Sequence, residues 1–185
     1  MRPVPALFGA LLITFGLGTA EAATSTAKTK STKSTTAKPS APVDTRVWSV
    51  VRGEGTYVLR FGQPRDPDPV FAATCQPSAQ LLQIAIEVEG KPFASGDGVP
   101  LSLTNGKRRL ELAATAFLGS SDGALVVEAA VALEPRVFDL FRAGDTLNAK
   151  MPAAIPKMPS VNQSFPLANA RARLADFEAS CLSRR

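Results

Sequence analysis

Residues 125–133 read LVVEAAVAL, and this stretch decides the fold class. Its apolar side chains recur at every second position, which is typical of a half-buried strand because successive side chains point to opposite faces. Runs with the same period surround Phe61, Phe71, Ile84 and Leu112. Several such strands in succession, without helices between them, predict an antiparallel sheet.

Turn-forming residues separate these runs. Asn105-Gly106 favours the positive φ angles of a type I′ turn, so we expect residues 101–104 to pair with residues 107–116 in a hairpin. Other breaks, rich in Gly, Pro, Asp and Ser, fall at residues 53–55, 63–69, 89–98 and 119–123.

Two helical segments are predicted beyond the strands. Pro135 suits the first position of a short helical turn over residues 135–142, which Gly144 stops. A C-terminal helix begins after Pro166, where apolar residues at spacings of three and four mark one helix face: Leu167, Ala170, Leu174, Phe177 and Cys181. The sequence therefore predicts a mainly β fold, an antiparallel β-sandwich or barrel with a short helical turn and a C-terminal helix.

The N-terminal part has a different composition. Residues 1–22 combine a basic start, an apolar run at 6–17 and small residues at Ala20 and Ala22, which is the anatomy of a secretory signal peptide. The run is too short to cross a hydrocarbon layer of about 30 Å. We expect cleavage to leave Ala23 first and the mature chain to reside in the periplasm or outside the cell.

Residues 23–43 contain only Ala, Thr, Ser, Lys, Pro and one Val, so we expect a disordered linker that precedes a β domain over residues 44–185. The linker's positive charge has two interpretations, weak adhesion to anionic surfaces or a solvated spacer. It comes from four lysines: Lys28, Lys30, Lys33 and Lys38.

Charge excludes one class of partner. The chain has 21 Lys and Arg residues against 16 Asp and Glu, but residues 44–185 hold 16 of the first group and 15 of the second. A nucleic-acid-binding domain needs basic residues clustered on its own surface. The cluster Lys107-Arg108-Arg109 lies at the expected turn, so we predict no nucleic-acid partner.

The two cysteines, Cys75 and Cys181, allow a single pairing. An even cysteine count in an exported chain favours a disulfide. If Cys75 ends a strand that faces inward, the bridge joins the C-terminal helix to the sheet. The alternative is two buried free thiols.

The sequence lacks the residues that several catalytic mechanisms require. The sequence has no His, which excludes Ser-His-Asp and Cys-His catalysis and His-ligated metal sites. It also has no CxxC pair and no phosphate-binding glycine loop. We therefore predict no catalytic residue, no cofactor and no metal. The lone Trp48 and the lone Tyr57 are expected to be buried near the first strand, with a recognition surface as the alternative.

The order of several features along the chain is similar to that in a known family. Trp48 comes early, a strand ends in Cys75, alternating strands follow, and a closing segment runs from Ser164 to Cys181. This layout resembles small periplasmic β-proteins of alphaproteobacterial type, distantly similar to the invasion-associated locus B family. Members of that family usually carry further cysteines, one of them soon after the early Trp, which this chain lacks. The resemblance implies a secreted β-sandwich or barrel without a recognised reaction.

These observations predict a secreted, non-enzymatic β protein that acts by surface binding to an envelope component or a protein partner. One alternative is a glycan hydrolase acting on the envelope through two carboxylates, for which Glu87 and Glu89 are candidates. Another is an enzyme inhibitor that presents a loop, either residues 63–69 or residues 151–159.

Overall fold

The computed structural model of the chain describes residues 44–120, 123–153 and 157–183. The predicted leader and linker, residues 1–22 and 23–43, lie outside these ranges. Neither helix of the described part is both long and apolar enough to cross a membrane. The elements follow in the order β1 (Val47–Arg52), β2 (Tyr57–Gly62), β3 (Phe71–Gln76), a 3₁₀ turn η1 (Pro77–Ala79), β4 (Leu81–Val88), β5 (Gly98–Asn105), β6 (Arg108–Leu118), β7 (Leu125–Ala132), α1 (Pro135–Arg142), β8 (Thr146–Met151), β9 (Val161–Pro166) and α2 (Arg171–Leu182).

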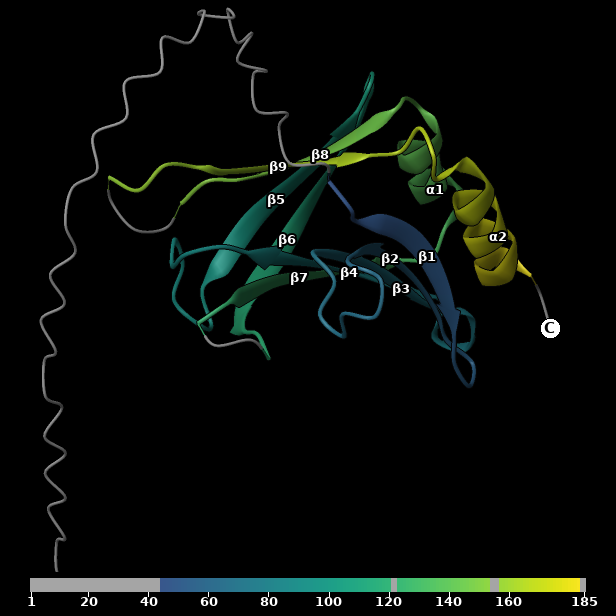
Figure 1. Cartoon of the computed structure of the whole chain (residues 1–185), viewed down its shortest axis with the longest axis horizontal. Helices are drawn as coiled ribbons and strands as arrows, with labels where there is room; N and C mark the ends of the chain where they lie inside the picture. The colour runs from purple at the N-terminus through teal and green to yellow at the C-terminus, as the bar shows by residue number, and fades with distance from the viewer. Residues whose placement is uncertain (1–43, 121–122, 154–156, 184–185) are drawn as a thin grey trace, which may run out of the picture. The chain divides into compact units, whose positions relative to one another are not determined.

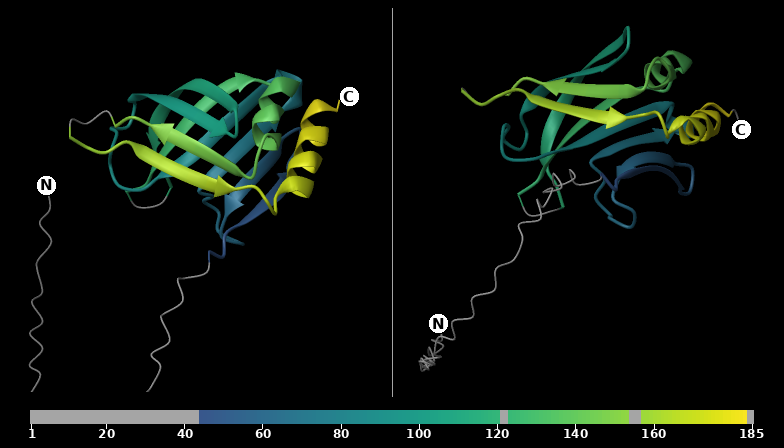
Figure 2. Two further views of the ribbon diagram at one scale, coloured as in Figure 1. Left: turned by 90° about the horizontal axis from the view of Figure 1, so that it is seen from above. Right: turned by 45° about the horizontal axis from the view of Figure 1, so that its top comes forward.

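The strands form one nine-stranded antiparallel sheet in the order β1-β2-β3-β4-β7-β6-β5-β8-β9. The sheet curls into an incomplete barrel (Figure 1), and Figure 2 shows the same curl from two further directions. The curl brings β9 onto β2 and β3, because the ring of Phe165 lies 6.0 Å from that of Phe61 and 5.0 Å from that of Phe71. The predicted mainly β class is confirmed.

The core fills the concave inner face of the curled sheet. Along β4 the inward positions Leu82, Ile84, Ile86 and Val88 are fully buried, while Gln83 between them is exposed. β3, β5 and β7 alternate in the same way, so the period-two prediction is confirmed. Each such Leu or Ile contributes about 1.5–3 kcal/mol when it leaves water.

The hairpin between β5 and β6 forms as predicted, but its turn is shifted by one residue. Asn105 pairs with Arg108, so the turn residues are Gly106 and Lys107 rather than Asn105 and Gly106. Gly106 has φ +56° and neither Asn105 nor Lys107 has a positive φ, which does not fit the predicted type I′ turn. Asn105 stays in the strand because its buried side-chain nitrogen donates to the carbonyl oxygen of Leu140, at 2.8 Å.

β8 and β9 are not among the strands that the sequence predicts. They form a ribbon with six residue pairs between them, whereas β8 pairs with β5 through three. The prediction of a surface loop over residues 151–159 is wrong at Met151, which ends β8 and is fully buried. Among the described residues of that loop, 157–159 are exposed.

The helices cover the open side of the curl, as Figures 1 and 2 show. α1 spans the predicted residues. α2 starts at Arg171, after a turn in which Leu167 and Ala170 are already buried, and the rest of the predicted face, Leu174, Phe177 and Cys181, packs into the core. Cys181 is bonded to Cys75 of β3, with 5.9 Å between their Cα atoms. The predicted disulfide between the C-terminal helix and the sheet is confirmed.

Candidate ligand-binding cavity

A cavity of about 690 Å³ lies beside the disulfide. Four segments that are distant in the sequence build its walls: the start of β2, the η1 turn, the residues before α1, and the last turn of α2. The lining residues are Gly55, Tyr57, Pro77, Ser78, Gln80, Leu133, Pro135, Ser180, Cys181, Leu182 and Ser183. Its volume lies within the range of about 300–1,000 Å³ that small-molecule sites usually have.

The η1 turn is fixed by local backbone geometry. Pro77 begins η1, and Gln80 ends it in the left-handed region at φ 51°, with its backbone nitrogen donating to Pro77 O at 3.2 Å. The carbonyl of Gln80 then accepts from the backbone nitrogen of Leu133, at 2.8 Å. This bond joins the η1 wall, directly before β4, to the wall formed by the residues that follow β7. A left-handed non-glycine residue is strained and is frequent at functional sites.

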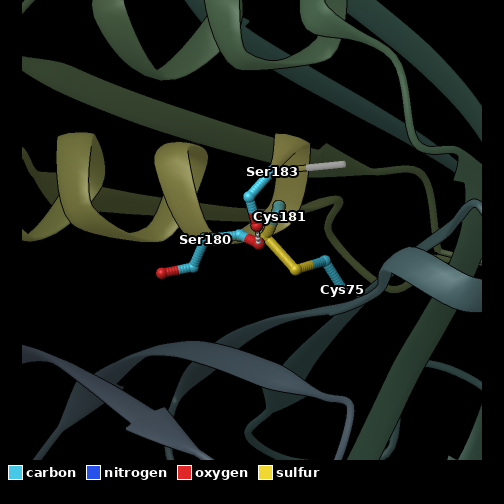
Figure 3. Close-up of a disulfide and its surroundings, with 4 residues drawn as sticks. All are labelled: Cys75, Ser180, Cys181 and Ser183. Carbon is cyan, nitrogen blue, oxygen red and sulfur yellow. Dashed lines mark hydrogen bonds between the residues drawn. A yellow bond between two sulfur atoms is a disulfide. The ribbon is translucent and has the colours of Figure 1, made fainter. Parts of the chain in front are cut away.

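The disulfide joins a further wall, the last turn of α2, to the η1 wall. Cys75 precedes Pro77 by two residues, and Cys181 lies within the lining segment of α2 (Figure 3). That segment ends in a local cap, in which Ser183 donates from Oγ to Ser180 O at 2.9 Å and from its backbone nitrogen to Ala179 O at 3.0 Å. The covalent bond therefore fixes the position of the α2 wall relative to η1.

The lining chemistry is mixed and uncharged. Proline rings and leucine side chains alternate with hydroxyl groups and one amide, and no lining residue among those described is Asp, Glu, Lys or Arg. Among the described residues, the two neighbours of Pro135 form an ion pair, Arg136 with Glu134, and Arg52 at the end of β1 pairs with Asp176 of α2 at 2.6 Å. The described lining thus offers apolar surface and hydrogen-bonding groups without a charged side chain.

A second, smaller cavity of about 140 Å³ lies on the outer face of the sheet. Glu87 and Asp68 both line it, and Ser120 donates from Oγ to Oδ1 of Asp68 at 2.6 Å. Burial raises the pKa of Glu87 above its ordinary value, and the carboxylates of Asp68, Asp66 and Glu89 raise it further.

Of the predicted carboxylate pair, Glu87 lies in β4 and lines this cavity, whereas Glu89 follows the end of β4 at Val88 and does not line it. The carboxylate of Glu89 is nevertheless close enough to raise the pKa of Glu87. The pairing of Glu87 with Asp68 was missed, because Asp68 belongs to the β2–β3 loop, which folds onto the outer face.

The other sequence candidates have ordinary structural roles. In the loop of residues 63–69, Asp66 accepts a hydrogen bond from the guanidinium of Arg60, which ties the loop to β2. Arg109 in the basic cluster is paired with Glu111. Trp48 is buried as predicted, and its indole nitrogen donates to Pro166 O at 2.6 Å. Tyr57 is half-buried and lines the large cavity. Its alternative interpretation as part of a recognition surface stays a prediction.

Comparison with known proteins finds a distant structural similarity. No family model matches it, and no curated protein matches it. Invasion associated protein B from Bartonella henselae, a solved structure, is similar over 75% of this chain and 99% of its own, with 19% identity and a TM-score of 0.45. This is the distant similarity that the layout of landmarks predicted.

Proposed function

We propose that this chain is an exported, non-enzymatic binding protein that holds an uncharged ligand in the cavity beside the disulfide. The observation that carries the proposal is the cavity itself. It has the volume of a small-molecule site, mixes apolar walls with hydroxyl and amide groups, and has its walls joined by the disulfide and by the hydrogen bond between Leu133 and Gln80. The predicted catalytically poor residue inventory supports binding rather than turnover.

Export is supported by the disulfide between Cys75 and Cys181, since such bonds persist in oxidising compartments. The leader-like composition of residues 1–22 supports it independently. Expression of the full chain in a bacterium, followed by fractionation and N-terminal sequencing, tests this. A mature chain that begins at Ala23 in the periplasm or medium is the expected result. A full-length chain in the cytosol would contradict export.

The binding proposal is tested with a set of uncharged small molecules and the amide spectrum of the isotope-labelled protein. We expect a binder to shift amides of the η1 turn and of the last turn of α2. Ser78→Trp should fill the cavity and abolish these shifts. Ser95→Trp is the matched control. Ser95 is also exposed, but it lies in the connection after the C-terminal end of β4, whereas Ser78 lies in η1, before the N-terminal end of β4. Shifts that persist in Ser78→Trp would contradict binding in this cavity.

A second candidate is a carboxylate-dependent glycan hydrolase, and the observation that favours it is the outer cavity shared by Glu87 and Asp68. A raised pKa suits a carboxyl group that donates a proton, and a second carboxylate would stabilise charge or attack. Turnover of envelope glycans that disappears in both Glu87→Gln and Asp68→Asn would favour this function over binding.

A further inference from the structure

We infer that the ligand of the cavity beside the disulfide is a neutral saccharide. The inference rests on the proposed function and names its ligand class. It starts from the types of polar group that the walls contribute and from their placement on four separate segments.

The polar groups of the lining match sugar hydroxyls in kind. Ser78 and Ser180 contribute hydroxyl groups and Gln80 contributes an amide, and each of these side chains can both donate and accept a hydrogen bond. Tyr57 and Ser183 add two further hydroxyl groups, of which that of Ser183 already donates to Ser180 O. A sugar hydroxyl has the same double capacity, so either direction of bonding is satisfied. A peptide backbone instead presents donors and acceptors at fixed positions, and recognition of proline-rich peptides uses grooves lined by several aromatic residues. This cavity has one, Tyr57.

The apolar part of the lining suits the other side of a sugar ring. Pyranose rings expose a face of C–H groups between their hydroxyl edges. Leu133, Pro77 and Pro135 supply rigid or compact apolar surface, and the ring of Tyr57 is amphipathic. The walls thus offer both apolar and hydrogen-bonding surface, as a sugar does.

The absence of charge among the described lining residues decides between kinds of saccharide. A uronic acid or an amino sugar would bring a charge into the cavity, and no described lining residue offers the opposite charge. The water that the charged group loses on binding is therefore not compensated by an ion pair. The geometry therefore favours neutral sugars over acidic or basic ones.

The experiment titrates the disulfide-bonded protein, over residues 23–185, with probes that differ in charge on a similar backbone. Tri-N-acetylchitotriose is neutral, its deacetylated trimer is cationic, and trigalacturonic acid is anionic. Maltotriose and cellotriose extend the neutral set, and an uncharged proline hexapeptide represents the peptide class. Binding is followed by amide shifts and calorimetry. Ser78→Trp blocks the cavity, Ser95→Trp is its control, and Ser78→Ala removes one hydroxyl only.

We expect at least one neutral trisaccharide to shift cavity amides, with the charged trimers at least tenfold weaker. Ser78→Ala should weaken binding about two- to tenfold, as expected for one neutral hydrogen bond, and Ser95→Trp should have no effect. Three results would overturn the inference: equal or tighter binding of a charged trimer, binding of the peptide alone, or no cavity shift with any neutral sugar. Binding of the peptide or of other uncharged molecules in the cavity would leave the proposed function intact, so the two failures are distinguishable.

Discussion

Gly144 lies directly against the side chain of Asn105, and a Cβ atom built on Gly144 would stand 2.5 Å from Oδ1 of Asn105. The same amide donates from Nδ2 to the carbonyl oxygen of Leu140 at 2.8 Å and of Gly144 at 3.3 Å. The buried side chain of Asn105, at the end of β5, therefore holds the end of α1 and the connection from α1 to β8 in place. This contact requires glycine for space, since Gly144 is not among the glycines with positive φ.

Gly144→Ala should lower the free energy of unfolding by about 1–3 kcal/mol, because the new methyl group forces the buried amide away from its carbonyl partners. Urea unfolding followed by circular dichroism measures the change. Gly98→Ala is the control, since nothing lies within 4 Å of a Cβ at Gly98 and its φ is not positive. Equal stability of the two variants would contradict this account of the contact.

Removing the disulfide, through Cys75→Ala together with Cys181→Ala, should lower the free energy of unfolding by roughly 2–5 kcal/mol. The bond closes a loop with a sequence separation of 106 residues, and an uncrosslinked unfolded chain gains the corresponding entropy. The last turn of α2 should also lose protection in hydrogen exchange, because the bond fixes it against η1. The parent protein in the presence of a reductant provides an independent comparison. A double variant as stable as the oxidised parent would show that noncovalent packing alone holds α2.

Trp48→Phe should lower the free energy of unfolding by about 1–2 kcal/mol. The variant keeps a ring against Phe61 and Phe71 but loses the indole hydrogen bond to Pro166 O, which joins β1 to the end of β9 across the curl. Unfolding must be followed by circular dichroism, since the chain has one Trp. An unchanged midpoint would show that stacking, without the hydrogen bond, holds these sheet ends together.

Glu87→Gln should change how stability depends on pH. The pKa of Glu87 is raised above its ordinary 4.5 in the folded state, chiefly by burial, so the folded chain binds more protons than the unfolded chain. The stabilisation from protonated Glu87 is present below about pH 4.5 and is lost as the pH rises through the folded pKa.

Glu87→Gln lacks this titration, so its stability relative to the parent should increase between pH 4.5 and 7. Carboxyl groups with lowered pKa values, Asp44 and Glu111, titrate in both proteins and cancel in the difference. Thermal unfolding of both proteins across this range measures the effect. A difference between the two that does not vary with pH would contradict the account.

The sequence predicts the parts of the fold that depend on local patterns. Alternation locates β4 and β7, and helical spacing places Cys181 on the buried face of α2. It fails where the contact partner is distant. Gln163 occupies an inward position of β9, where alternation calls for an apolar residue, and its Nε2 donates to Glu87 O at 2.7 Å across the curl. Because polar residues interrupt the pattern, β9 carries no clear strand signal.

The candidate cavity depends even more on tertiary structure. Two of its hydroxyl groups come from Ser78 and Ser180, which are ordinary residues of a turn and of a helix end when the sequence is considered alone. Nothing local distinguishes them until the disulfide and the curl of the sheet bring their segments together. The sequence singled out two of the lining residues, Tyr57 as the only tyrosine and Cys181 as one of the two cysteines.

The bond between Cys75 and Cys181 turns most of the domain into a covalent ring that contains β4 to β9 and both helices, while β1 and β2 remain outside it. A protease that cuts the backbone once inside the ring opens it without releasing a fragment, so the nicked protein keeps its mass until it is reduced. A cut between β2 and β3 instead frees the N-terminal hairpin, which only strand pairing and packing then retain. Resistance to the loss of a fragment after a single cut is thus distributed unequally along the chain.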